Sequence, residues 1–361
     1  MQYSQFVKMQ KSFILFILQV FLFFCTTSAQ VKLLENEKFP ALFSFGDSIL
    51  DTGNNNNLNT VTKCNFPPYG RDFPGGIPTG RFCNGKVPSD LIAEALGIKD
   101  TLPAYLDPNL QSNDLPTGVC FASGGSGCDP LTATIQGILS LSDQLGLFQQ
   151  YIGKLKGVVG EARANDIISN SLFLVSAGNN DIAISYSITA RRFQYDFPSY
   201  ANQLVTWSST FLKDLYGLGA RRIGVLSTLP LGCLPGARAV GALEAGCEVI
   251  TNQEAQLFNT KLSSMVDSLE STLPDAKLVF IDVYSPLFDI VRDPQNYGFL
   301  VTRNGCCGTG TFEIGVTCNQ FTPLTCPDAS TYVFWDSGHP TERAYRIIVS
   351  EIVHKYFNNF I

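Results

Sequence analysis

Five short runs of apolar residues recur along the chain, and turn-forming residues follow each of them. The runs are built from apolar, β-branched and aromatic side chains, and each is followed by Gly, Asn, Pro or Ser. Runs of this length with such boundaries are typical of strands that are buried on both faces. The five runs span residues 41–45, 118–122, 171–176, 222–227 and 277–283.

Between these runs, apolar positions recur with a period of about 3.6 residues, which indicates amphipathic helices. The clearest segments span residues 89–96, 141–152, 199–216 and 248–271. Apolar strands that alternate with such helices are typical of a parallel sheet covered on both faces. Because no repeat or linker divides the chain, the pattern predicts a single three-layer α/β/α domain with five parallel strands.

Polar clusters follow the first three runs and carry candidate chemistry. G-D-S (46–48) ends the first run, S-G-G-S-G (123–127) follows the second, and A-G-N-N-D (177–181) follows the third. The carboxyl ends of parallel strands meet at one edge of a sheet, where ligands bind in open α/β folds. We therefore expect these three clusters to lie together.

The first 29 residues have the pattern of a secretory signal peptide. Lys8 and Lys11 precede an apolar run at 13–25, and small residues follow up to Ala29. The run is shorter than the ~20 residues that span a bilayer, so it is a poor membrane anchor. This predicts cleavage after Ala29 and a secreted, extracellular domain over residues 30–361, with no transmembrane segment in the mature form.

Charge argues against nucleic acid as a partner. The chain has a formal net charge of −6, and its first 29 residues hold two lysines and no acidic residue, so the remainder carries −8. No basic block remains in that part, and a basic patch is what nucleic-acid binding requires. The sequence leaves the oligomeric state open.

Ten of the eleven cysteines lie beyond Cys25. An even number of cysteines in a secreted chain favours disulfides. Cys306 and Cys307 are adjacent, so we expect them to take different partners. The pairings that the sequence suggests are Cys233 with Cys247, and Cys307 with Cys318 or Cys326.

Only two histidines occur in the chain, His339 and His354. His354 shares a helical stripe with polar residues, which indicates a solvated face. His339 belongs to W-D-S-G-H-P (335–340), just before a helical pattern that runs from Thr341 to about residue 357. Asp336 could accept a hydrogen bond from its Nδ1 and leave Nε2 free as a general base. A purely structural Asp–His pair would look the same, and the residues alone leave both interpretations open.

Other hydrolytic sites have weaker support. An H-E-x-x-H zinc site needs two closely spaced histidines and is absent, as is the G-x-S-x-G elbow. A papain-like Cys–His pair needs an unpaired thiol, which the even cysteine count disfavours. A glycosidase-like carboxylate pair has no local pattern, although the composition leaves it open.

The motifs G-D-S, S-G-G-S, G-N-N-D and D-S-G-H-P occur in this order, and with them the sequence resembles the plant GDSL esterase/lipase family of SGNH hydrolases. The resemblance covers nearly all of the chain beyond the leader. Cys83 and G-K-V-P-S-D (85–90) are most similar to the extracellular pollen-coat lipases of that family. The resemblance implies a five-stranded parallel sheet in flavodoxin-like order.

The resemblance also implies roles for individual residues. Ser48 would be the nucleophile, His339 the base and Asp336 its partner. The oxyanion donors would be the Ser48 amide, Gly124, with Gly125 as the alternative register, and Asn180. The family often has Asn where this chain has Cys120, which leaves these positions intact.

The implied activity is hydrolysis of lipid or other acyl esters through an acyl-enzyme on Ser48, without a metal or organic cofactor. One alternative is an acyltransferase that uses the same triad. Another is a catalytically inactive lipid- or glycan-binding protein, against which the intact Ser–Asp–His set argues. The natural substrate depends on the loops at 54–84, 100–117 and 294–330.

Overall fold

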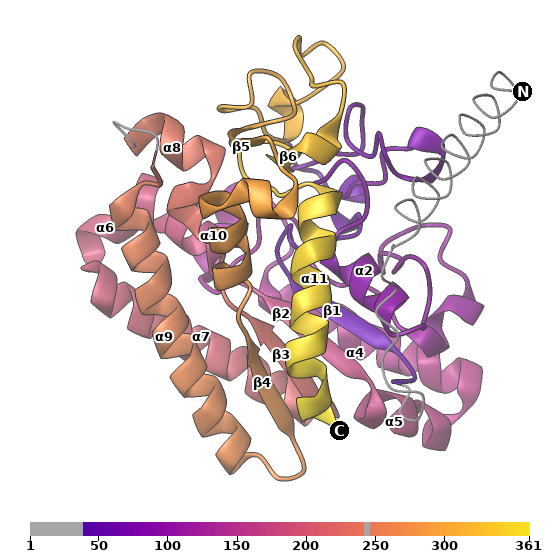
Figure 1. Ribbon diagram of the computed structural model, residues 1–361. Coiled ribbons are helices and arrows are strands. Elements are labelled where there is room, and N and C mark those ends of the chain that lie inside the picture. The colour runs from indigo at the N-terminus through magenta and orange to yellow at the C-terminus, as the bar shows by residue number, and fades with distance from the viewer. Residues whose placement is uncertain (1–38, 242–245) are drawn as a thin grey trace, which may run out of the picture. The chain divides into compact units, whose positions relative to one another are not determined.

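A parallel sheet of four strands lies at the centre of the structure, a computed structural model that describes residues 39–241 and 246–361 (Figure 1). The strands are β1 (Leu42–Gly46), β2 (Leu172–Ser176), β3 (Arg222–Leu226) and β4 (Lys277–Ile281), in the order β1-β2-β3-β4. Nearly all of their residues are buried, as expected for a sheet covered on both faces. The predicted signal peptide and the domain boundary at residue 30 lie outside the described residues.

Helices cover the sheet in two layers. They are α2 (Pro88–Ala95), α3 (Pro130–Gln136), α4 (Leu141–Val159), α5 (Glu161–Asn170), α6 (Arg191–Gln194), α7 (Phe197–Gly217), α8 (Pro235–Gly241), α9 (Val249–Thr272), α10 (Tyr284–Arg292) and α11 (Glu342–Tyr356). Helix α7 contacts α4 and α9, whereas α2 contacts α11, and Figure 1 shows α2 and α11 in front of the sheet. The helices predicted before β4 are confirmed as α2, α4, α7 and α9, and the C-terminal one as α11. No helix in the described ranges is long and apolar enough to cross a membrane.

The predicted fifth strand, residues 118–122, is wrong as a full strand. Only Cys120 forms bridges, to Ser44 of β1 on one side and to Ala104 on the other. Gly118, before this residue, has a left-handed backbone, and the glycine turn (residues 123–126) begins directly after the segment. The extended stretch is therefore too short to form a ladder of strand hydrogen bonds. The segment still lies beside β1, where the second strand of a flavodoxin-like order belongs.

A second, two-stranded parallel sheet pairs β5 (Val301–Gly305) with β6 (Tyr332–Phe334). The segment between these strands is closed by two disulfides, Cys306–Cys326 and Cys307–Cys318. The adjacent cysteines therefore take different partners, as predicted, and the predicted Cys233–Cys247 disulfide is also present.

Complete pairing of the cysteines, which the even count favoured, does not occur. Four cysteines of the described chain are buried free thiols: Cys64, Cys83, Cys120 and Cys128. Burial raises the pKa of each thiol above its ordinary value. A thiol that stays protonated is a poor nucleophile. Unpaired thiols therefore exist, but none is poised for papain-like chemistry.

Candidate active site

Ser48 lies on a tight turn at the carboxyl end of β1. Gly46 has a φ of +115°, and a Cβ there would lie 1.8 Å from the Ser176 carbonyl oxygen, so only glycine fits. The Asp47 carboxylate braces the turn by accepting from the Ile49 amide, the Ser176 hydroxyl and the Asn179 side chain. In the described part of the chain the Ser48 amide has no acceptor, which leaves it available as a donor.

His339 and Asp336 lie on the turn that leads into α11, as predicted. The Trp335 amide donates to the His339 carbonyl, which closes the turn, and the Thr341 hydroxyl accepts from the Ala344 amide as the helix N-cap. Pro340 therefore lies before the cap rather than in the first helical turn. His354 lies on the exposed side of α11, as its polar stripe indicated.

Folding brings Ser48, His339 and Asp336 into one hydrogen-bonded row. Ser48 Oγ is 2.8 Å from His339 Nε2, and His339 Nδ1 is 2.9 Å from both carboxylate oxygens of Asp336. The exposed fractions are 8% for Ser48, 5% for His339 and 0% for Asp336. The Phe82 ring lies against the imidazole, with centroids 5.2 Å apart. This arrangement can move a proton from a hydroxyl to a ring whose other nitrogen is held by an anion.

The glycine turn places Gly124 and Gly125 in different environments. The Gly124 amide donates to Asp51 Oδ2 at 2.8 Å, so it is already occupied. Gly125 lines the cavity beside Ser48, has a φ of +90°, and its amide has no acceptor among the residues described. The geometry thus favours the alternative register, Gly125, over the predicted Gly124 as an oxyanion donor.

Asn180 lies after β2, directly before the helical turn Asp181–Tyr186, and it lines the same cavity. Its side-chain amide donates to the Ser126 carbonyl at 2.9 Å. Its neighbour Asn179 also lines the cavity, where its side chain donates one hydrogen to Asp47 Oδ2 and accepts from the Leu229 amide. Each asparagine therefore keeps one amide hydrogen, and the side chain of Asn179 is further restrained because its oxygen also accepts a bond.

Asp181, the residue after Asn180, forms hydrogen bonds with the residues that follow the glycine turn. Its carboxylate accepts from the Cys128 and Asp129 amides and from the Thr132 hydroxyl. Burial of this carboxyl raises its pKa from 3.8 to about 6 despite these donors. The two oxyanion candidates, Gly125 and Asn180, therefore come from segments that one buried carboxylate holds together.

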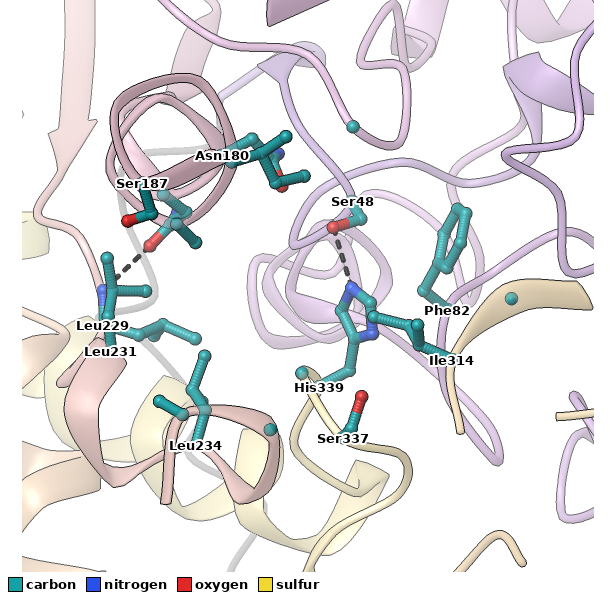
Figure 2. A pocket seen from close by; sticks show the side chains of 18 of the residues that line it. Ser48, Phe82, Asn180, Ser187, Leu229, Leu231, Leu234, Ile314, Ser337 and His339 are labelled. Carbon is teal, nitrogen blue, oxygen red and sulfur yellow. Dashed lines mark hydrogen bonds between the residues drawn. The ribbon is translucent and has the colours of Figure 1, made fainter. Parts of the chain in front are cut away.

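A cavity of about 890 Å³ opens around Ser48 and His339. Figure 2 shows that the Ser48–His339 pair lies between two apolar walls. The labelled apolar side chains are Leu229, Leu231 and Leu234 on the side of Asn180, and Phe82 and Ile314 on the opposite side.

Two residues of the site gave no signal in the sequence. Asp51 holds the Gly124 amide and also accepts from the Gly53 and Asn54 amides. Tyr69 donates its hydroxyl hydrogen to Asp336 Oδ2 at 2.7 Å. Both lie in or beside a loop rich in Gly, Pro and Asn, where a single Asp or Tyr is unremarkable until the fold shows its partner.

Comparison with known proteins places the chain in a family. The profile of GDSL-like Lipase/Acylhydrolase matches residues 42–352. The GDSL esterase/lipase EXL3 of Arabidopsis thaliana is 52% identical over 341 residues, which cover 94% of each chain. Another GDSL esterase/lipase of that plant is 53% identical over 332 residues, covering 92% of this chain and 89% of its own.

Solved structures give a more distant likeness. An acetylxylan esterase from Geobacillus stearothermophilus aligns with a TM-score of 0.41 at 10% identity, over 89% of this chain and 95% of that one. A goat-rumen metagenome lipase aligns with a TM-score of 0.39 at 12% identity, over 87% and 96%. The order of the parallel strands defines the fold, and sequence similarity identifies the family. By both the profile and the plant relatives, this chain belongs to the GDSL lipase/acylhydrolase family and is a serine hydrolase of carboxylic esters.

Proposed function

We propose that this protein hydrolyses esters of apolar carboxylic acids through an acyl-enzyme on Ser48. The observation that carries the proposal is the 2.8 Å contact between Ser48 Oγ and His339 Nε2, together with the contact between His339 Nδ1 and the Asp336 carboxylate. A serine hydroxyl becomes an effective nucleophile when an adjacent base removes its proton.

In the first half-reaction, Ser48 Oγ attacks the ester carbonyl carbon while His339 Nε2 takes the hydroxyl proton. The tetrahedral intermediate then collapses, the C–O bond to the alcohol breaks, and His339 returns that proton to the departing alcohol. In the second half, water gives a proton to Nε2 and attacks the acyl carbon; the bond from that carbon to Ser48 Oγ then breaks, His339 returns the proton to Oγ, and the acid leaves. Asp336 keeps Nδ1 protonated and stabilises the imidazolium in both halves.

Three donors would stabilise the negative oxygen of each tetrahedral intermediate. They are the Ser48 amide, the Gly125 amide and the Asn180 side chain, all of which belong to residues that line the cavity. Donors that already point at the developing charge need no reorganisation during the reaction. We assign the glycine to Gly125 because Asp51 occupies the Gly124 amide.

The cavity supports a substrate with a long apolar acyl group. Its volume of about 890 Å³ is far more than an acetyl group fills, and three leucines form much of one wall. Binding an apolar chain there removes apolar surface from water, which is favourable by about 0.8 kcal/mol per buried CH₂. We expect kcat/KM for p-nitrophenyl esters to rise from acetate to longer acyl chains. A maximum at acetate would contradict this substrate class.

Organophosphate labelling tests the nucleophile directly. Wild-type protein should form a covalent adduct on Ser48, and Ser48→Ala should form none. Ser337→Ala removes another serine hydroxyl from the same cavity and should still be labelled. Labelling of Ser48→Ala at the wild-type level, or none of the wild type, would overturn the proposal.

Hydrolysis is distinguished from acyl transfer by the products. With an excess of a small alcohol present, a hydrolase releases mainly the free acid, whereas a transferase forms mainly the new ester. Both share the acyl-enzyme, so this measurement is needed in addition to labelling.

We further propose that the protein is secreted. The leader pattern of residues 1–29 supports this, as do three disulfides in the described chain, since disulfides persist in oxidising compartments. N-terminal sequencing of protein recovered from plant cell medium should begin at Gln30. Retention of the full-length chain inside the cell would contradict this.

A further inference from the structure

The Asp336 carboxylate is held by donors from two different parts of the chain. Oδ1 accepts from the Gly338 and His339 amides at 2.9 and 2.8 Å, within its own turn. Oδ2 accepts from the Tyr69 hydroxyl at 2.7 Å, across 267 positions of sequence. Among the described residues, Tyr69 is the only group outside the turn that restrains this carboxylate.

The direction of this hydrogen bond follows from the partners of the hydroxyl. The Gly315 amide donates to the Tyr69 oxygen at 2.7 Å, and a backbone amide can only donate. The single hydrogen of the hydroxyl is therefore free to go to the carboxylate. Burial and the nearby Asp336 raise the pKa of Tyr69 well above its ordinary value, so the phenol keeps its hydrogen.

The Tyr69 ring is fixed by its packing. Its exposed fraction is 1%, and it lies edge-on to the rings of Phe66, Phe82 and Trp335 with centroids 6.0 to 6.2 Å apart. The two disulfides between β5 and β6 pack in the same buried cluster. A phenol held on all sides can direct its hydroxyl at one oxygen without the entropy cost of a mobile side chain.

We propose that Tyr69 is a positioning residue that keeps the Asp336 carboxylate aimed at His339 Nδ1. Gly315, which holds the Tyr69 oxygen, lies between Ile314 and Val316, and both of these line the cavity. One hydroxyl thus connects the cavity wall to the acid of the triad. The inference rests on the proposed function of Ser48, His339 and Asp336.

Tyr69→Phe removes the hydroxyl and keeps the ring. We expect kcat to fall roughly 10- to 100-fold, as for a lost hydrogen bond to a charged group, with KM within about twofold. A carboxylate that no longer points at Nδ1 stabilises the imidazolium less. The acid limb of the pH–rate profile should therefore move to lower pH.

Tyr345→Phe is the matched control. Tyr345 is also almost fully buried, with 1% exposed, but its hydroxyl has no hydrogen-bond partner among the described residues. The same substitution there should leave kcat and the acid limb at wild-type values. Melting temperatures of both variants, and kcat expressed per organophosphate-titrated site, separate lost folding from lost positioning.

A spectroscopic measurement does not depend on turnover. The chain has only two histidines, so ¹⁵N-histidine labelling gives one pair of ring nitrogen signals from each, and His354→Gln assigns the pairs. In wild type and Tyr345→Phe, the neutral His339 ring should carry its hydrogen on Nδ1. In Tyr69→Phe, the ring ¹⁵N shifts should show a mixture of the two tautomers.

Identical His339 spectra in wild type and Tyr69→Phe, together with an unmoved acid limb, would overturn the proposal even if Tyr69→Phe melted earlier or turned over more slowly. Failure of the proposed function gives a different result. In that case the wild type would not be labelled by the organophosphate, and the tautomer measurement alone would decide the role of Tyr69.

Discussion

The side-chain amide of Asn180 carries two hydrogens, and the fold uses one of them. That hydrogen goes to the Ser126 carbonyl, which fixes the amide plane at the edge of the cavity. The second hydrogen is then available for a negative oxygen bound near Ser48. Fixing the donor in this way costs the protein nothing at the moment of reaction.

We expect Asn180→Ala to lower kcat by about 10²–10³ with little change in KM, because the lost donor acts mainly in the transition state. Steady-state kinetics on a p-nitrophenyl ester measures this. Asn57→Ala, which removes an exposed amide that does not line the cavity, serves as the control. A raised KM with unchanged kcat would show that Asn180 binds the ground state instead.

At the scale of elements, a buried ion pair joins the loop before α2 to the helix. Arg81 Nε and Nη2 donate to the two Asp90 oxygens, each at 2.7 Å. The same guanidinium donates to the carbonyls of Thr52 and Leu102 at 3.1 Å. Arg81 therefore anchors the loop as a structural residue, and every bond it makes is internal.

Arg81→Ala should lower the free energy of unfolding by about 3–5 kcal/mol, because it leaves the Asp90 charge buried without a partner. Arg163→Ala breaks an exposed Arg–Asp pair and should cost only about 0–1 kcal/mol. Urea denaturation of both variants measures the difference. Equal losses would mean that burial of the first pair adds nothing.

The wall formed by the segment before α8 offers a test of the substrate class. Leu234→Trp should lower kcat/KM for a long-chain p-nitrophenyl ester by about 10-fold or more, because the larger ring fills space that the chain needs. Turnover of the acetate ester should persist. Leu300→Trp makes the same change at an exposed residue outside the cavity wall and should alter neither substrate.

The sequence predicted the helices better than the strands. An amphipathic stripe over many residues, as in α7 and α9, leaves little ambiguity about a helix. The apolar run at 118–122 has the same composition as a true strand. Whether this run forms a strand depends on Gly118 and on the two bridge partners of Cys120. These partners, Ser44 and Ala104, lie outside the run.

At the scale of the whole molecule, the three residues of the hydrogen-bonded row could be singled out from the sequence, and the residues that support them could not. Ser48, Asp336 and His339 lie in contiguous motifs that carry their own signal. The choice between Gly124 and Gly125 depends on which amide Asp51 occupies, 73 positions away. Tyr69 reaches Asp336 only through the complete fold.

Burial of Asp181 makes stability depend on pH. Its pKa is raised from 3.8 to about 6, so the folded protein holds the proton more tightly than the unfolded chain does. Its stabilising contribution is complete below about pH 4 and is lost as the pH rises through about 6, by roughly 3 kcal/mol. The amide of Asp181→Asn does not titrate in this pH range, so the variant should not show this loss of stability.

Denaturant unfolding of wild type and Asp181→Asn from pH 4 to 7 measures that difference. The stability of wild type relative to the variant should decline across the range. Asp214→Asn makes the same substitution at an exposed position and serves as the control. A constant difference for Asp181→Asn would show that this carboxyl is ionised in the folded protein throughout.

The contact between Ser48 and His339 spans 291 positions of the chain. During synthesis the Ser48 hydroxyl leaves the ribosome 291 residues before the imidazole that we propose as its base. Under the proposed mechanism, a nascent chain therefore cleaves no ester until the segment that carries His339 has been made and has folded against Ser48.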